Sequence, residues 1–128
     1  MTEGIKTMEK PVISVITPVF NEEECLPAFY ERVVPIMEKI GLPFEIIAVD
    51  DGSRDKSLEI ISEHCKKDKR LKCVSFSRNF GQQAAFFCGL ENCSGDAAIL
   101  IDADLQDPPE IFPEMIAKWR EGYDVVHG

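Results

Sequence analysis

The chain has fewer basic than acidic residues and no long apolar run, and each of these features argues against one class of protein. Its 128 residues carry 14 lysines and arginines against 23 aspartates and glutamates, a formal net charge of −9. A nucleic-acid-binding protein usually shows a basic face, so we expect no nucleic acid among its partners. No apolar run reaches the roughly 18 residues that a membrane helix needs, so these residues are not predicted to span a bilayer.

The five cysteines suggest neither a disulfide framework nor a zinc site. Their number is odd and no two form a C-x-x-C pair. Because Met1–Lys10 is polar and charged, we expect no secretory signal there and read 1–10 as a polar extension. We therefore expect reduced thiols in a cytosolic protein, most of them filling the core. They are Cys25, Cys65, Cys73, Cys88 and Cys93.

Short apolar runs alternate with amphipathic stretches, which predicts one α/β domain with a parallel sheet between two layers of helices. We expect strands at 12–17, 44–50, 71–76 and 97–102, and the start of a fifth at Asp124–Val126. Helices are expected between them, starting at Gln82 and behind caps at Asn21, Asp55 and Asp107, and the helix behind Asn21 should end at Gly41. The inward stripes predicted for the helices include Phe29, Met37, Leu58, Ile61, Phe112 and Ile116.

Ligands of such a sheet bind outside the carboxyl ends of its strands, so the residues after each apolar run are the informative ones. Asp102 and Asp104 give the strongest signal there. They are two residues apart, so in extended backbone their side chains leave the same face and converge. Two such carboxylates repel unless a cation lies between them, and oxygen ligands, with the amide of Gln106 nearby, suit Mg²⁺ or Mn²⁺. The alternative is that the aspartates only cap turns.

Three other residues at these strand ends have two interpretations each. Asp50 could accept N–H groups of uracil or guanine, or could cap the turn that follows it. Arg78 could hold a phosphate through paired hydrogen bonds, or could pair with a nearby acid. Glu22 could lie at the ligand, or could supply a favourable negative charge near the start of a helix.

Together, four segments of the chain resemble the nucleotide-sugar domain of inverting family 2 glycosyltransferases, which have the Rossmann-like, three-layer GT-A fold. The last two resemble most closely dolichyl-phosphate mannose synthases and bacterial polyprenyl-phosphate glycosyltransferases. The resemblance covers the chain from Pro11 onward. The segments are Thr17-Pro18-Val19-Phe20-Asn21-Glu22, Val49-Asp50-Asp51-Gly52-Ser53, Ser77-Arg78-Asn79-Phe80-Gly81 and Asp102-Ala103-Asp104-Leu105-Gln106-Asp107-Pro108-Pro109-Glu110.

The resemblance implies roles for the matched residues. Asp50 would hold the base, and Asp51 would lie near the ribose and phosphates. Asp102, Asp104 and Gln106 would hold the Mg²⁺ or Mn²⁺ that bridges the diphosphate, which makes the two aspartates the catalytic candidates. The residues implied to contact the nucleotide are Pro18, Phe20, Glu22, Asp50, Asp51, Arg78, Asp102, Ala103 and Asp104.

The implied reaction moves a sugar from a UDP- or GDP-sugar to an acceptor such as undecaprenyl or dolichyl phosphate, in envelope glycan synthesis. The family continues past Gly128 with acceptor-side elements and, in this subgroup, membrane helices. We therefore expect 11–128 to be an incomplete donor-binding part that is soluble by itself, binds nucleotide weakly and transfers little sugar. The whole protein would lie at the cytoplasmic face of a membrane, and a homo-oligomer is compatible with this expectation.

Two other functions fit part of the pattern. A phosphoacceptor receiver domain shares the size, the alternation of strands and helices, and the Mg²⁺ requirement. Its acidic pair should follow the first strand, however, whereas Asp50 and Asp51 follow the second. A catalytically silent nucleotide-binding module would share every feature of the donor site, and only an assay of transfer separates it from an enzyme.

Overall fold

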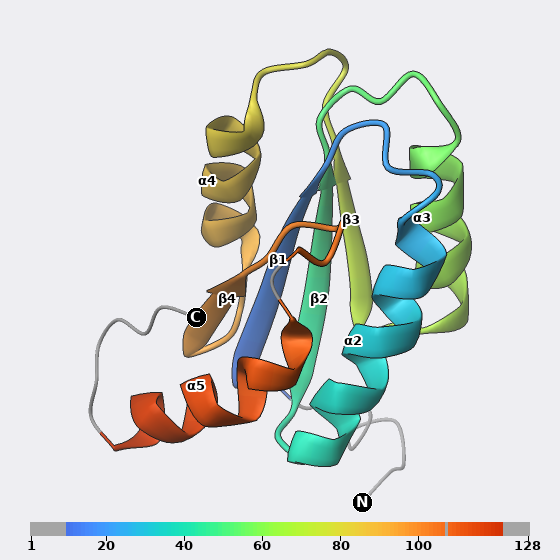
Figure 1. Ribbon diagram of the computed structural model, residues 1–128. Helices are drawn as coiled ribbons and strands as arrows, with labels where there is room; N and C mark the ends of the chain where they lie inside the picture. Colours follow the sequence, from blue (N-terminus) through green and yellow to red (C-terminus); the bar gives the residue numbers. More distant parts are fainter. Residues whose placement is uncertain (1–9, 107, 122–128) are drawn as a thin grey trace, which may run out of the picture.

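The computed structural model describes residues 10–106 and 108–121. They form a parallel sheet of four strands between two layers of helices (Figure 1). This arrangement confirms the predicted three-layer α/β fold class. In chain order the elements are β1 (Ile13–Val19), α2 (Leu26–Ile40), β2 (Phe44–Asp50), α3 (Ser57–Lys67), β3 (Leu71–Ser75), α4 (Gln82–Asn92), β4 (Ala97–Leu100), the short 3-10 helix η1 (Pro109–Ile111) and α5 (Phe112–Arg120).

The strands lie in the order β3-β2-β1-β4, and every neighbouring pair is parallel. β1 and β2 pair along their whole lengths, from Ile13 beside Phe44 to Val19 beside Asp50. Since parallel strands end at the same edge of a sheet, the loops that follow them leave the sheet together. The fold thereby brings the polar segments to one edge, as the sequence predicts.

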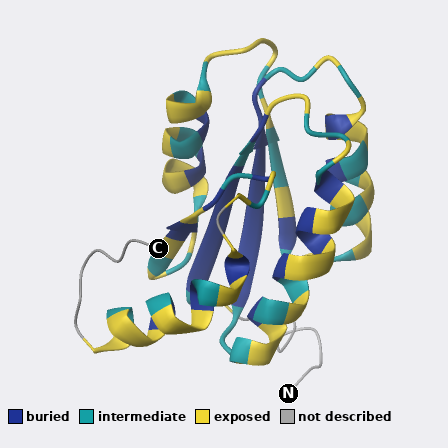
Figure 2. Cartoon of the chain, viewed as in Figure 1, coloured by how far each residue is buried: buried dark blue, intermediate teal, exposed yellow. Residues whose placement is uncertain are grey.

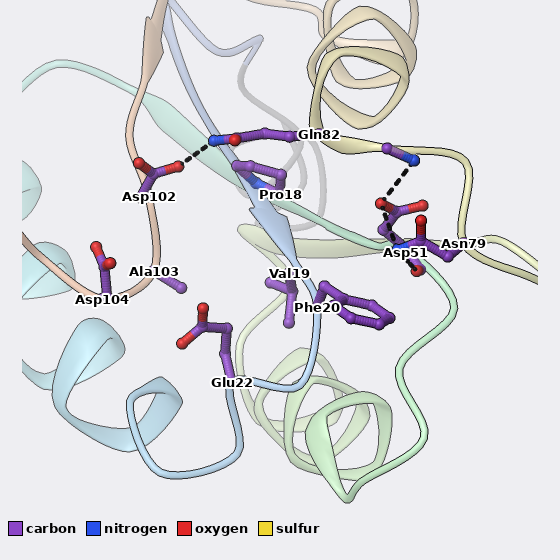
Figure 3. Close-up of a pocket in the computed structure, with 11 residues that line it drawn as sticks. Pro18, Val19, Phe20, Glu22, Asp51, Asn79, Gln82, Asp102, Ala103 and Asp104 are labelled. Carbon is purple, nitrogen blue, oxygen red and sulfur yellow. Dashed lines mark hydrogen bonds between the residues drawn. The ribbon is translucent and has the colours of Figure 1, made fainter.

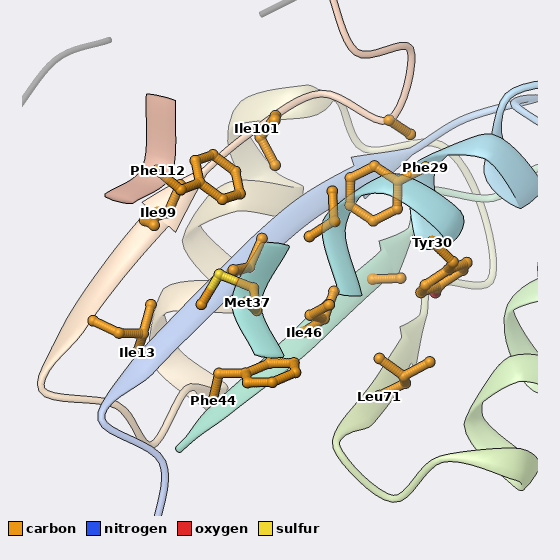
Figure 4. Packing of buried hydrophobic residues seen from close by; sticks show 14 of the residues in the cluster. Ile13, Phe29, Tyr30, Met37, Phe44, Ile46, Leu71, Ile99, Ile101 and Phe112 are labelled. Carbon is orange, nitrogen blue, oxygen red and sulfur yellow. The ribbon is translucent and has the colours of Figure 1, made fainter. Parts of the chain in front are cut away.

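Two apolar clusters, one on each face of the sheet, hold the layers together (Figure 2). The larger joins the sheet to α2 and α5 and includes Phe29, Met37 and Phe112, which confirms three of the predicted inward positions (Figure 4). The smaller joins the sheet to α4 through Ile47 and Ala85. Fully burying a side chain as large as phenylalanine or methionine contributes about 1.5–3 kcal/mol, so these contacts are a main source of stability.

α4 packs closely on β1 because its inner face is made of small residues. Ala85 and Gly89, one turn apart, are its buried residues. A Cβ atom at Gly89 would overlap the side chain of Ile16, so the helix could not lie this close with any other residue there. The outer face of α4 exposes Phe87 and Leu90.

The expected cap at Asn21 is wrong. α2 begins five residues later, at Leu26, and no side chain in the described part of the chain caps it. Asn21 instead has a left-handed backbone, with φ of 53°, and its side-chain oxygen accepts a hydrogen bond from the backbone N–H of Arg54 (2.9 Å). The oxygen that a cap would use is thus engaged by a neighbouring loop. The helix ends at Gly41, as predicted, and continues through Pro35.

Three further expectations differ from the structure. Leu58 is 36% exposed and not part of the inward stripe of α3, which begins at Ser57. Asp55 is not the N-cap residue itself, although its carboxylate accepts the backbone N–H of Ser57 (2.9 Å). β4 ends at Leu100 and not at Asp102. The polar extension apart from residue 10, the cap at Asp107 and the strand at 124–126 lie outside the described residues.

Within the described ranges, no helix is both long enough and apolar enough to cross a membrane.

A buried carboxylate, Glu45, lies near the amino-terminal ends of the strands, opposite the end where the polar segments gather. It is 1% exposed and accepts hydrogen bonds from Ser14 Oγ, Ser94 N and Lys72 Nζ, each 2.6 Å long. Burial raises the pKa of this carboxyl, but the hydrogen bonds from Lys72, Ser14 and Ser94 outweigh burial and hold the pKa below its ordinary value of 4.5. The charge is therefore tolerated inside the fold because each of its oxygens has a partner.

Replacing this carboxylate should destabilise the fold in a pH-dependent way. We expect Glu45→Gln to lower the free energy of unfolding by about 1–3 kcal/mol at neutral pH, since buried donors lose a charged acceptor. Because the folded pKa is lowered, the native stabilisation is fully present above pH 4.5 and is lost as the pH falls through the folded value. Urea unfolding across the acid range should show the difference from wild type shrinking.

The matched control is Glu38→Gln, which removes an exposed carboxylate that pairs with Arg70 at the surface. Its cost should stay below about 1 kcal/mol at every pH. A loss in Glu45→Gln that stays constant as the pH falls would contradict the role assigned to the buried charge.

Candidate functional site

A hollow of about 450 Å³ opens at the carboxyl edge of the sheet, between the end of β1, the start of α4 and the loop after β4 (Figure 3). Four acidic residues line it, and its lining among the described residues includes no lysine or arginine. Carboxylates gathered in one concave site favour a bound cation, because each lowers the potential felt by the others. The acids are Glu22, Asp51, Asp102 and Asp104; the other lining residues are Pro18, Val19, Phe20, Asn79, Gly81, Gln82 and Ala103.

The thiol of Cys25 lies beside this acidic lining. Burial, then a hydrogen bond with Glu22 and the charges of Glu22 and Asp104, raise the pKa of the Cys25 thiol. Because the thiolate is the reactive form of cysteine, this environment does not activate Cys25 as a nucleophile.

A turn, and not an extended strand, presents Asp102 and Asp104 to the hollow. The turn follows the end of β4, with Ala103 only 2% exposed at its centre. Leu105 has a left-handed backbone, with φ of 57°, and its N–H donates to the carbonyl of Asp102 (3.2 Å). The side chain of Asp104 accepts the N–H of Gln106 (3.2 Å), so it does cap its own turn while it also lines the hollow.

The two aspartates fit a divalent cation that takes its other ligands from a substrate. In residues 10–106 and 108–121, no group of three or more aspartate, glutamate, histidine or cysteine side chains is placed to hold a metal ion. Mg²⁺ is commonly bound by one or two carboxylates, several waters and substrate phosphates. Gln106 lies outside the lining of the hollow, and its role as a third ligand stays a prediction.

A second hollow of about 430 Å³ adjoins the first, beyond Phe20 and Asn79, which line both. Its chemistry differs, because Arg54 and Arg78 line it. The Arg78 guanidinium lies 4.6 Å from the centre of the Phe80 ring. The other lining residues are Asn21, Asp50, Gly52, Ser53, Leu58, Ser75, Phe76 and Ser77.

Asp50 lies in the wall of the second hollow, and one of its two predicted interpretations, the turn cap, is observed. It is 1% exposed. Its Oδ2 accepts the backbone N–H of Ser53 (3.3 Å), which confirms the turn cap. Its Oδ1 is buried and has no hydrogen-bond partner in the part of the chain that the structure describes. A buried carboxylate oxygen without a donor is costly, so this atom is suited to accept an N–H from a ligand.

The structure therefore distributes the predicted site residues over two adjoining hollows. Asp50 and Arg78 lie in the second, and Gln106 lines neither. Those that line the first are Pro18, Phe20, Glu22, Asp51, Asp102, Ala103 and Asp104.

Small polar side chains join the loop after β1 to the loop after β2. The backbone N–H of Asn21 donates to Ser53 Oγ (2.9 Å), and that of Glu22 donates to Ser57 Oγ (2.8 Å). The N–H of Glu23 donates to Asp55 Oδ2 (3.2 Å). These bonds satisfy the donors of a loop that has no helix of its own, so both hollows have a fixed wall.

The loop after β3 is held in turn by Asp51. The two oxygens of this 3% exposed carboxylate accept the backbone N–H groups of Phe80 (2.7 Å) and Gly81 (3.0 Å) and the side-chain amide of Asn79 (3.2 Å). Gly52 makes the approach possible. It has a left-handed φ of 74°, and a Cβ there would overlap backbone atoms of Arg78 and Asn79.

Four residues that line the first hollow were not predicted: Val19, Asn79, Gly81 and Gln82. All but Val19 belong to the polar segment after β3, in which only Arg78 was a predicted site residue. The available signal was the position of the segment at the edge of the sheet. Neutral amides gave less indication than a charged residue, although they supply donors without altering the charge of the hollow.

The sequence profile of Glycosyl transferase family 2 matches residues 14–128. The chain belongs to this family. The membership decides against the receiver-type signalling domain. It agrees with the family resemblance of the four polar segments.

Individual relatives support the same family. The chain is 47% identical over 114 residues to the uncharacterized glycosyltransferase YkcC of Bacillus subtilis (strain 168). It is 46% identical over 115 residues to the undecaprenyl-phosphate 4-deoxy-4-formamido-L-arabinose transferase of Pectobacterium atrosepticum. Each alignment covers 89% of this chain, and the chain spans only 35% of the length of either relative.

Among solved structures, the chain is similar to glucosyl-3-phosphoglycerate synthase from Mycobacterium tuberculosis, in complex with Mn²⁺, uridine diphosphate and glucosyl-3-phosphoglycerate. The TM-score is 0.67 at 28% identity, over 91% of this chain and 42% of that chain. This similarity confirms the expected nucleotide-sugar transferase fold.

The close contact of Gly52 with the backbone of Arg78 and Asn79 can be tested by comparison with a second glycine, which has a similar φ but no close neighbour among the described residues. Gly41 also has a left-handed φ, of 84°, and a Cβ there would meet no atom of the described residues within 4 Å. We expect Gly41→Ala to cost about 1–2 kcal/mol, the strain of a left-handed alanine. Gly52→Ala should cost more, because the loop after β3 must also move. Chemical unfolding of both variants measures this, and equal losses would contradict the close packing of the two loops.

Proposed function

We propose that the chain binds the nucleoside diphosphate of a UDP- or GDP-sugar, and that the whole protein transfers the sugar to a polyprenyl phosphate with inversion. The observation that carries the proposal is the charge of the first hollow. It lies where a sheet of this fold binds phosphorylated ligands, yet its lining has four acids and no described basic residue. A diphosphate can occupy such a site only together with a cation, which is the arrangement that metal-dependent sugar transfer needs.

The second hollow supports a place for the base. Asp50 Oδ1, buried without a donor, would accept the N3–H of uracil or the N1–H of guanine. Phe20 is 43% exposed at the boundary of the two hollows, where an aromatic ring can stack on a base or ribose. A nucleotide that crosses this boundary would have its base near Asp50 and its phosphates near Asp102 and Asp104.

Asp102 and Asp104 would hold Mg²⁺ or Mn²⁺ against the diphosphate. The bound cation would offset the charge of the departing nucleoside diphosphate. The chain's own residues would bind and orient the donor: Asp50 through the base, and the turn around Ala103 by holding the two aspartates in place.

A lipid phosphate is proposed as acceptor because its oxygen is already ionised near neutral pH. Such a nucleophile needs little help from a general base, unlike a sugar hydroxyl. The relative from Pectobacterium atrosepticum is named for undecaprenyl phosphate, which supports this class of acceptor. The acceptor would place the whole protein at the cytoplasmic face of a membrane.

Metal-dependent nucleotide binding tests the proposal. Calorimetry or thermal shift with UDP, GDP and their sugar derivatives should show weak binding that strengthens in Mn²⁺. Asp104→Ala should abolish the Mn²⁺-dependent part, because a ligand of the cation is lost. Glu59→Ala, which removes an exposed acid of α3 outside both hollows, is the control and should bind like wild type. Nucleotide binding that changes neither with Mn²⁺ nor with Asp104→Ala would contradict the proposed cation site. Metal-dependent binding by a whole protein that transfers no sugar would identify a catalytically silent module.

The base contact can be tested by the choice of nucleotide. The N3 of cytosine is an acceptor, so a carboxylate at Asp50 should favour UDP or GDP over CDP by about tenfold or more, the value of one charged hydrogen bond. Asp50→Asn presents an amide and should lose that preference, while its oxygen can still cap Ser53. Asp96→Asn, at the opposite edge of the sheet, is the control. An unchanged preference in Asp50→Asn would show that the base is read elsewhere.

A further inference from the structure

The start of α4 brings a side chain to Asp102. Gln82, the first residue of α4, donates from Nε2 to Asp102 Oδ1 at 2.6 Å (Figure 3). This is a short hydrogen bond to an ionised acceptor, of the kind that fixes the orientation of a carboxylate. Gln82 also lines the first hollow, so its contact with Asp102 is made inside the proposed donor site.

The position of Gln82 depends on contacts of the preceding loop, and not only on its own hydrogen bond with Asp102. The two backbone N–H groups that precede it in the chain, of Phe80 and Gly81, both donate to the buried carboxylate of Asp51. Gly52 lets this loop lie against the turn after β2. A continuous set of contacts therefore runs from the end of β2, through the loop after β3, to Asp102 on the loop after β4.

We propose that Gln82 is a positioning residue of the donor site, which holds Asp102 in the rotamer that faces the cation, and that Asp51 and Gly52 set the position of Gln82. Hydrogen bonds to metal-binding carboxylates orient them and tune affinity, and their loss typically weakens metal binding 10- to 100-fold. The inference rests on the proposed function, because Asp102 matters in this way only if it binds a cation.

The amide of Gln82 suits this task better than a charged group. It supplies an N–H donor while leaving the negative charge of the hollow unchanged. A lysine in its place would compete with the cation for the carboxylate, and a glutamate would repel Asp102. This explains why a neutral residue stands beside four acids.

The direct test is the affinity for Mn²⁺ itself, measured from the paramagnetic resonance of the free ion, with and without UDP. Gln82→Met keeps the length of the side chain but removes the N–H, and should weaken Mn²⁺ binding by about tenfold, within the range known for such contacts. Gln83→Met makes the same change at an exposed neighbour that lies outside the hollow and should bind Mn²⁺ like wild type. Melting temperatures of both variants should stay close to wild type.

A double-variant cycle tests the part played by the loop. Gly52→Ala displaces the loop without changing any charge, and should weaken Mn²⁺ binding in the wild-type background. In the Gln82→Met background it should still lower the melting temperature, but should not weaken Mn²⁺ binding further, because the side chain that transmits the displacement is gone. A merely structural effect of Gly52→Ala would instead weaken binding by the same factor in both backgrounds.

The outcomes separate this inference from the proposed function. If wild type binds Mn²⁺ and Gln82→Met binds it equally well, the positioning role is overturned and the cation site stands. If wild type binds no Mn²⁺, with or without UDP, the proposed cation site fails and this inference fails with it.

Discussion

The parallel pairing of β1 with β2 is the constraint on which the rest of the structure depends. Their register places Val19 beside Asp50, so the loops that follow both strands start at the same level of the sheet. Most residues that line the two hollows belong to these loops and to the loops after β3 and β4, so the shape of the site depends on how the loops are held. They are held by side chains, since Ser53, Ser57 and Asp51 supply acceptors for backbone N–H groups that no helix satisfies.

Acidic and basic side chains at the carboxyl ends of the strands lie in different hollows, although the chain as a whole is acidic. The first hollow gathers four carboxylates, and the two described arginines in the neighbourhood line the second. A ligand that bridges the hollows would meet an acidic region that needs a cation and, next to it, guanidinium groups that attract an anion directly. A metal-bound nucleoside diphosphate has both features, which is why the proposed function follows from charge as well as from family membership.

Much of the fold could be predicted from sequence because its signals are local. β2 was predicted with its bounds because a run apolar on both faces has few other interpretations, and Gly41 marked a helix end by its backbone preference. The predicted helix cap at Asn21 is wrong, because its side-chain oxygen accepts a hydrogen bond from a loop more than thirty residues away. The local preference of asparagine for a helix cap is outweighed by its contact with Arg54, which forms only in the folded chain.

The site shows the same division. The spacing of Asp102 and Asp104 predicted that their side chains converge from an extended strand. Both line the first hollow, but a turn presents them, so the predicted backbone geometry was wrong and their role as metal ligands stays a prediction. Gln82 was not among the predicted site residues, and only the folded structure shows that its Nε2 lies 2.6 Å from Asp102 Oδ1. Residue type indicates which groups can bind an ion; which neighbours orient them depends on loops that meet through tertiary packing.

The small inner face of α4 has a consequence for the far end of that helix. A helix is stiff along its axis, and Gly89 lies about 10 Å along it from Gln82. A bulkier residue at position 89 would overlap Ile16, so α4 would have to shift, and because the helix is stiff its first turn would move relative to Asp102. The close contact between Gly89 and Ile16, inside the fold, thus helps to determine where Gln82 lies relative to Asp102.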